Sequence, residues 1–273
     1  MIVVEIKRVM EQVYILRDIG GCCANLVVGK ERALLFDTGC GVENMRSAVE
    51  HVTDLPLLVI NSHGHFDHIC GNPQFDEVYL AKEDFRILER YEAAQLDGWR
   101  RDMAKGAQEG QFAAPPREWN CMRVLDFAKF DLGELVCRVI PLPGHSAGSV
   151  GIWIEKLGLL LSGDAVTPVM CMNFYNHMPL AVQLATLRRV EKLPFTCYLT
   201  SHHDCLFGRE MLGRLIGCIE RSKTGRFHHY QYPYPPYADG AMYVDSLEGE
   251  PVALILEEKD CPPDAFRRRK QIL

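Results

Sequence analysis

The chain has 273 residues, 48% of them hydrophobic, which is enough for one large core or two small ones. Its formal net charge of −6 gives no basic face for nucleic acid, and the absence of an 18-residue apolar run excludes a predicted membrane span. The cysteines are odd in number, irregular in spacing and form no Cys-x-x-Cys pair, so they favour a reducing compartment. Since residues 1–7 do not resemble a signal peptide, we expect a cytoplasmic protein.

Short β-prone runs dominate the first third of the chain, and Gly20, Gly21 and Gly29 predict turns between them. A helix is expected over residues 42–51, directly before an apolar strand. The predicted strands of this part cover residues 12–17, 25–28, 33–36, 57–60 and 77–80.

A helical insertion is predicted over residues 82–112, where charges mix with Ala, Leu and Met at helical spacing. Phe85, Tyr91, Trp99 and Phe112 would give it an apolar face for ordinary packing, for a lid or for a homodimer contact. Further strands are predicted over 122–125, 135–140, 149–154, 159–161, 195–199 and 252–256, helices over 179–192 and 208–222, and a loop over 227–236. With neither a short repeat nor a low-complexity linker, we expect residues 1–273 to form a single domain of sheets packed together with helices outside.

Four metal-ligand side chains follow the apolar strand 57–60 within six residues: His63, His65, Asp67 and His68. A tight loop cannot direct all of them at one point. His63 and His65 can face one ion, while Asp67 and His68 face a second. Imidazole and carboxylate suit zinc, iron or manganese, so the spacing predicts a site for two metal ions.

Three later residues of ligand type also stand just after predicted strands, namely His145, Asp164 and His202. Each follows small residues at the end of an apolar run, so all three can meet the first cluster at one sheet edge. His203 is an alternative to His202, but a small residue precedes His202, as Gly144 precedes His145.

The order of these residues resembles that of the metallo-β-lactamase-fold hydrolase superfamily over about residues 12–205. The resemblance implies a four-layer αβ/βα sandwich with two divalent ions, most often zinc, at the edge of the sheets. It implies that His63, His65 and His145 bind the first ion, that Asp67, His68 and His202 bind the second, and that Asp164 bridges them. Asp37 resembles an early acid of the family and is expected to shape a turn rather than to bind metal.

A water between two such ions would supply hydroxide near neutral pH, and Asp67 could accept or pass on its proton. The favoured activity is hydrolysis of an ester, thioester or lactone in a small-molecule substrate. A phosphodiesterase on the same fold and a non-catalytic metal-binding protein remain alternatives, although a purely structural site would be closed.

Residues 144–148 also match the Gly-x-Ser-x-Gly elbow of serine hydrolases, with Ser146, Asp164 and His202 in the corresponding order. That elbow needs a strand directly before the serine and a helix directly after it. Pro141 and Pro143 precede Ser146, and a β-prone run follows it, so the context disfavours this activity.

The branch of the superfamily is narrowed by residues near the bridging acid. The classical β-lactamases lack an acid where Asp164 stands, and this favours the thioesterases, lactonases and glyoxalase II-like enzymes. Asn173 occupies the place of a lysine that grips glutathione in glyoxalase II enzymes, so a glutathione thioester is disfavoured. Tyr175 and Asn173 are the two residues expected to contact substrate. Thr167 replaces a tyrosine of the lactonases.

Overall fold

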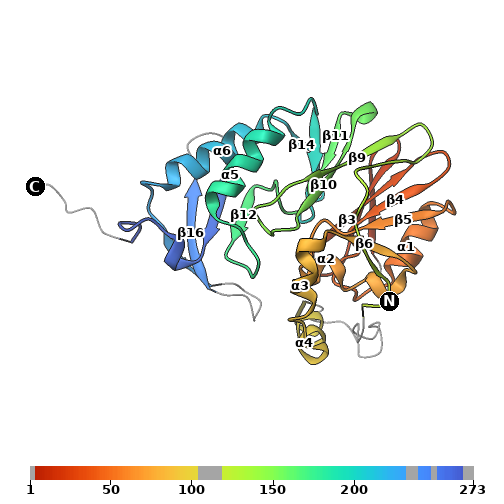
Figure 1. Ribbon diagram of the computed structural model, residues 1–273, viewed down its shortest axis with the longest axis horizontal. Helices are drawn as coiled ribbons and strands as arrows, with labels where there is room; N and C mark the ends of the chain where they lie inside the picture. The colour runs from red at the N-terminus through yellow and green to blue at the C-terminus, as the bar shows by residue number, and fades with distance from the viewer. Residues whose placement is uncertain (1–3, 104–118, 232–238, 247–250, 267–273) are drawn as a thin grey trace, which may run out of the picture.

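Two β-sheets lie face to face in the computed structural model, with helices on their outer sides (Figure 1). The structure describes residues 4–103, 119–231, 239–246 and 251–266. None of the helices in these ranges is long and apolar enough to cross a membrane.

The first sheet follows chain order and is antiparallel up to β4, then parallel from β4 to β7. Its strands are β1 (Glu5–Met10), β2 (Val13–Arg17), β3 (Cys23–Val28), β4 (Ala33–Phe36), β5 (Leu57–Ile60), β6 (Val78–Leu80) and β7 (Met122–Val124). The helices of this half are α1 (Met45–Val52), α2 (Phe66–Ile69), α3 (Phe85–Leu88) and α4 (Ala93–Met103), with 3₁₀ turns η1 (Asn72–Gln74) and η2 (Lys82–Asp84).

The second sheet pairs β11 and β13 in parallel at its centre. In spatial order its strands are β14 (Phe207–Gly208), β13 (Cys197–Leu199), β11 (Leu159–Leu161), β10 (Val150–Ile154), β9 (Val136–Pro141) and β8 (Lys129–Asp131). Helices α5 (Leu180–Val190) and α6 (Met211–Ser222) cover it, and η3 (Glu155–Leu157) joins β10 to β11.

A third sheet lies beyond α5 and α6, at the far end of the molecule from α1 (Figure 1). It runs in the order β12 (Val169–Met172), β17 (Val252–Leu256), β16 (Gly240–Asp245) and β15 (His228–Tyr230), with η4 (Glu258–Asp260) after β17. This sheet shares one apolar cluster with the two helices and the outer face of the second sheet.

Alternation along single strands produces the layers. In β4, Leu34 and Phe36 join the core between the two sheets, whereas Ala33 and Leu35 pack with α1 on the outer side. The three leucines of β11 divide in the same way, because successive side chains of a strand point to opposite faces. The predicted αβ/βα sandwich is therefore confirmed, with the third sheet added to its second half.

Some sequence-based predictions need correction. Residues 228–230 of the expected loop 227–236 form β15, because Tyr230 and its neighbours pair with β16; residues 232–236 lie outside the described residues. The helix expected from residue 208 begins at Met211, since Phe207 and Gly208 pair with β13. The predicted helical insertion over residues 82–112 consists of η2, α3 and α4 in its described part, and its residues 104–112 lie outside the described residues. Strands β1, β8, β12 and β16 were not predicted.

Candidate metal centre

All the residues predicted to bind metal meet at one edge of the two facing sheets. They come from the segments after β5, β9, β11 and β13: His63, His65, Asp67, His68, His145, Asp164 and His202. Backbone hydrogen bonds tie the sheets together at this edge, from Val150 N to Ser62 O and from Cys23 N to Ser201 O, both 2.8 Å long. The loops are thus anchored to both sheets.

Three imidazole nitrogens converge on one point. His63 Nε2 lies 3.0 Å from His65 Nδ1, which lies 3.0 Å from His145 Nε2, and the third separation is 3.2 Å. Tetrahedral zinc, with Zn–N bonds of about 2.0–2.1 Å, separates its nitrogens by about 3.3 Å. The spacing therefore fits three ligands of one ion.

The opposite ring nitrogens fix which atoms face that point. His65 Nε2 donates to Tyr175 O at 3.2 Å, and His145 Nδ1 donates to Cys171 O at 2.7 Å. His63 Nδ1 lies 2.9 Å from Ser62 Oγ, whose own proton goes to Asp37. Because those nitrogens carry the protons, the three converging nitrogens present lone pairs, and a cation between them would remove their repulsion.

A second group adjoins the first. His202 Nε2 lies 3.1 Å from Asp164 Oδ2 and 3.5 Å from Asp67 Oδ2, and His68 Nε2 lies 3.5 and 3.6 Å from the same two oxygens. Asp164 Oδ2 is also 3.8 Å from His145 Nε2, so this carboxylate stands between the two groups. That position is the one expected of a bridging ligand.

Two buried atoms in this group are left without a hydrogen-bond partner, His68 Nε2 and Asp164 Oδ1. A metal ion would satisfy both, whereas a dry site would leave their desolvation uncompensated. The residues present therefore fit divalent ions.

The histidines of the two metal-ligand groups differ in the direction of their pKa shifts. Burial, and then the neighbouring His65, lower the pKa of His145 to about 3, so that side of the centre holds neutral imidazoles. Burial alone would lower the pKa of His68, but the charges of Asp67, Asp37 and Asp164 raise it well above its usual value. The negative charges of the acids in the second group would therefore stabilise a cation bound there.

His203 does not join the cluster. Its Nδ1 lies 3.0 Å from Thr200 Oγ1 and its ring packs edge-on against Phe207, with 5.1 Å between ring centroids. The structure therefore brings His202, rather than its neighbour, to the centre.

Asp37 orients the ligands without facing the ion site. Its carboxylate accepts from His68 Nδ1 at 2.9 Å, from Ser62 N at 2.7 Å and from Ser201 Oγ at 2.8 Å. Asp37 has φ of +71°, a backbone conformation that costs a non-glycine residue free energy. The turn-shaping role expected from the sequence agrees with this placement.

Asp84, which was not singled out in the sequence, bonds to the loops that carry the predicted metal ligands. It is fully buried at the end of η2 and accepts hydrogen bonds from Gly64 N, Ser146 Oγ, Gly148 N and Asn176 Nδ2, at 2.6–2.9 Å. A Cβ on Gly148 would lie 2.7 Å from this carboxylate, so glycine is needed there. Asp84 follows the short strand β6, and the same strand-end reasoning that selected Asp164 could have found it.

Among the described residues, Ser146 Oγ forms its hydrogen bonds with an acid and a serine rather than with a histidine. Its Oγ donates to Asp84 at 2.6 Å and lies 2.8 Å from Ser149 Oγ. It lies in the loop before β10 rather than between a strand and a helix, so the nucleophile-elbow context is absent here, as the sequence predicted.

The two residues predicted to contact substrate differ in placement. The Tyr175 side chain is 41% exposed at the rim beside His65, and the guanidinium of Arg90 lies 3.4 Å from its ring centroid. Asn173 is only 2% exposed and its amide nitrogen lies 3.3 Å from the position of a Cβ on Gly240. Tyr175 is therefore accessible to substrate, and Asn173 is packed beneath β16.

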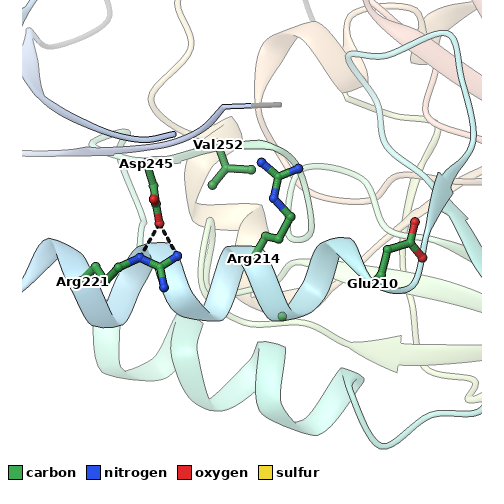
Figure 2. A pocket seen from close by; sticks show the side chains of 6 residues that line it. Glu210, Arg214, Arg221, Asp245 and Val252 are labelled. Atoms are coloured by element: carbon green, nitrogen blue, oxygen red, sulfur yellow. Dashed lines mark hydrogen bonds and ion pairs between the residues drawn. The ribbon is translucent and has the colours of Figure 1, made fainter. Parts of the chain in front are cut away.

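A separate cavity of about 240 Å³ lies between α6 and the third sheet (Figure 2). Arg214, Arg221 and Asp245 line it, and Arg221 Nε donates to Asp245 at 2.8 Å. None of the predicted metal ligands lines this cavity, so it does not belong to the metal centre.

Comparison with known proteins agrees with the family resemblance of the ligand residues. The model of the metallo-beta-lactamase superfamily matches residues 17–202, more than half of the chain. Acyl-coenzyme A thioesterase MBLAC2 from Homo sapiens is 27% identical over 224 residues, covering 74% of this chain and 80% of that protein. A hydroxyacylglutathione hydrolase from Synechococcus sp. is 26% identical over 148 residues, covering 54% of this chain and 49% of that protein.

Solved structures share the fold at low sequence identity. A metallo-beta-lactamase from Pontibacter korlensis has a TM-score of 0.58 at 17% identity and covers 80% of this chain and 99% of its own. The sec-alkylsulfatase Pisa1 from Pseudomonas sp. has a TM-score of 0.62 at 13% identity, covering 81% of this chain and 42% of that protein.

Proposed function

The chain belongs to the metallo-beta-lactamase superfamily, and on that premise we propose that it is a hydrolase that uses two divalent metal ions to cleave thioesters. The observation that carries this proposal is the position of Asp164 Oδ2, 3.1 Å from His202 Nε2 and 3.8 Å from His145 Nε2. A carboxylate between a three-imidazole group and a mixed histidine–aspartate group is suited to bridge two ions. Zinc is the expected metal, and iron and manganese suit the same ligands.

When bound, divalent ions polarise an acyl carbonyl and lower the pKa of water. The protein contributes position and proton transfer. We assign His63, His65 and His145 to one ion and Asp67, His68 and His202 to the other, with Asp164 shared. Asp67 is the candidate to accept the proton of the attacking water and to deliver it to the leaving thiol, because its side chain is partly exposed at the mouth of the site.

The substrate class is proposed from three observations. The relative matched over most of both chains is named as an acyl-coenzyme A thioesterase. A largely apolar cavity of about 520 Å³, lined by Phe127, Val139 and Val150, adjoins the loop that carries His145 and has room for an acyl chain. Buried Asn173 supplies no cation for a glutathione carboxylate. An acyl thioester of coenzyme A is therefore favoured over one of glutathione.

The test is a turnover screen of the zinc-loaded protein against acyl-coenzyme A thioesters, a glutathione thioester, lactones and phosphodiesters. We expect the highest kcat/KM on an acyl-coenzyme A thioester. A preference for phosphodiesters would favour that activity instead, and absence of all turnover with two ions bound would support a non-catalytic metal-binding protein.

Two variants separate the metal mechanism from a serine hydrolase. Asp67→Asn should lower kcat by more than about 100-fold, since proton transfer by a positioned side chain contributes about 10²–10⁴-fold. Ser146→Ala should retain turnover, because Ser146 bonds to Asp84 rather than to a histidine base. Loss of turnover in Ser146→Ala with the metal content intact would contradict the proposal.

A further inference from the structure

Two cysteine side chains meet just behind the metal centre. Cys22 lies in the turn before β3 and Cys40 in the segment after β4, and their Sγ atoms are 3.5 Å apart. Both are thiols rather than disulfide-bonded, and they are 2% and 0% exposed. Segments distant in sequence thus place two sulfur atoms side by side in the interior.

One carboxylate holds this pair together. Asp18 Oδ1 accepts from Cys22 N at 2.8 Å, and Asp18 Oδ2 accepts from Cys40 N at 2.7 Å. Gly39 has φ of +73°, and a Cβ there would lie 2.5 Å from Asp18 Oδ2, so the approach of the two segments requires glycine. The arrangement is built by the backbone and does not depend on side-chain rotamers alone.

The donor atoms have the spacing of metal ligands. Asp18, Cys22 and Cys40 each offer one atom, and these atoms lie within 4.8 Å of one another. Two sulfurs on tetrahedral zinc, with Zn–S bonds of about 2.3 Å, are separated by about 3.8 Å. Each Asp18 oxygen accepts one backbone bond and keeps a second lone pair for a cation.

We propose that Asp18, Cys22 and Cys40 form a third cation site that binds a thiophilic divalent ion, Zn²⁺ or Cd²⁺. Binding converts both thiols to thiolates and releases their two protons to solvent. The ligands proposed for the two catalytic ions offer only nitrogen and oxygen, so sulfur gives this site a different metal preference.

The charge around the pair supports a cation. Glu43 is buried, its Oε1 accepts from Ile19 N at 2.6 Å, and its Oε2 has no hydrogen-bond partner. Burial, and then the charge of nearby Asp18, raise the pKa of Glu43 to about 7. Asp18 and Glu43 are therefore two buried acids whose charges repel, and a cation bound at Asp18 would relieve that repulsion.

The site is coupled to the catalytic centre by direct contact. Cys22 Sγ lies 3.7 Å from Asp67 Oδ2 and 4.0 Å from His202 Nδ1. The His202 side chain is 35% exposed, so we expect an ion to reach the pair from the side of the same centre. A cation held there would compete for Asp67 and repel the second catalytic ion, so we expect excess zinc to inhibit turnover.

The binding test is a Cd²⁺ titration of the zinc-loaded protein in a non-thiol reductant, monitored by the ultraviolet charge-transfer absorption of cadmium–thiolate bonds. Because Cys205 is exposed, every protein should carry Cys205→Ser. We expect the absorption in the parent protein, its loss in Cys22→Ser and in Cys40→Ser, and its retention in Cys23→Ser, the buried neighbour that serves as a matched control.

Two results would overturn the site: absorption that persists in the Cys22→Ser/Cys40→Ser protein, or absorption that needs Cys22 but not Cys40, which would make Cys22 a ligand of the second catalytic ion. Since a serine at buried position 40 could disturb folding, Cys40→Ala provides a second variant, and circular dichroism verifies the fold of each. This readout does not depend on turnover, so it stands apart from the proposed thioesterase activity.

The expected inhibition of turnover by excess zinc rests on the proposed function. We expect Cys40→Ser to need about tenfold more zinc for half-inhibition, with turnover unchanged at low zinc. Equal sensitivity of the two proteins to zinc would refute the coupling to Asp67.

Discussion

Asp164 Oδ2 lies within 4 Å of a histidine nitrogen in each half of the proposed centre, at 3.8 Å from His145 Nε2 and 3.1 Å from His202 Nε2. Asp164→Asn keeps the size of the side chain but removes the charge that two ions would share. We predict the loss of at least about one ion per chain and a fall in kcat/KM beyond about 100-fold, since even residues that only support ligands cost about 10–100-fold. Metal analysis of the purified protein and thioester kinetics measure both effects.

Asp204→Asn is the matched control for this substitution. Asp204 is an acid two residues from His202, but its side chain is half-exposed and forms a surface ion pair with Lys7. It should retain both ions, because surface pairs contribute little. Equal metal content in the two variants would show that Asp164 is not a bridging ligand.

His202 and His203 are adjacent in sequence but lie in different environments. His202 Nε2 contacts Asp164, whereas His203 packs against Phe207. We predict that His202→Ala loses the second ion and most of its turnover, while His203→Ala keeps both ions. Native mass spectrometry of the two proteins counts the ions directly, and the reverse pattern would assign the ligand to His203.

At the scale of loops and short helices, Asp84 joins the segments that carry the ligands. It accepts bonds from Gly64, beside His63 and His65, and from Ser146 and Gly148, beside His145. Asp84→Asn would turn an amide NH₂ toward donors that then lack an acceptor. We predict a loss of about 3 kcal/mol in the free energy of unfolding, which is typical of a buried charged acceptor left unmatched.

Urea denaturation of the metal-free protein measures this loss without the contribution of bound ions. Glu83→Gln is the control, because Glu83 is the neighbouring acid of η2 and is exposed. If Asp84→Asn proved as stable as Glu83→Gln, the four hydrogen bonds would not be what holds the loops together.

The strands that the sequence predicts best are those buried on both faces. The runs 33–36, 57–60, 159–161 and 252–256 agree with β4, β5, β11 and β17, because continuous apolar residues bounded by turns leave few alternatives. Strands β8 and β15 are short and polar, and they exist through pairing with β9 and β16. Local pattern cannot reveal such strands, since their partners supply the stabilisation.

The residues of the metal centre also divide into those that local sequence pattern reveals and those that only the fold brings together. His63, His65 and Asp67 could be found from their dense spacing, and His145 and Asp164 from their places after apolar strands. Asp18, Cys22 and Cys40 could not, because their proximity follows from hydrogen bonds between two separate turns. A pair of thiols becomes a site only when the fold brings it together.

At the scale of the whole molecule, the third sheet supports the centre although it lies mostly beyond the residues that the superfamily model matches. Strand β12 supplies Cys171 O, which accepts from His145 Nδ1 and thereby sets the nitrogen that faces the ion site. Its Met170 and Met172 pack in one cluster with Leu254 and Leu256 of β17. The C-terminal strands thus stabilise a strand that orients a ligand.

This arrangement predicts that residues 206–273 cannot be removed. Truncation after Cys205 would expose the face of α5 and β12 that packs on Leu215, Ile219 and Leu254, all fully or almost fully buried. Each large apolar side chain contributes about 1.5–3 kcal/mol on burial, against a total stability of about 5–15 kcal/mol, so the remainder should lose its cooperative thermal transition and its metal. Circular dichroism melts of the truncated protein and of the full chain, together with metal analysis of both, test this. A truncated protein that still melts cooperatively with two ions bound would show that the third sheet is an independent unit, and that residues 1–273 are not the single domain expected from the sequence.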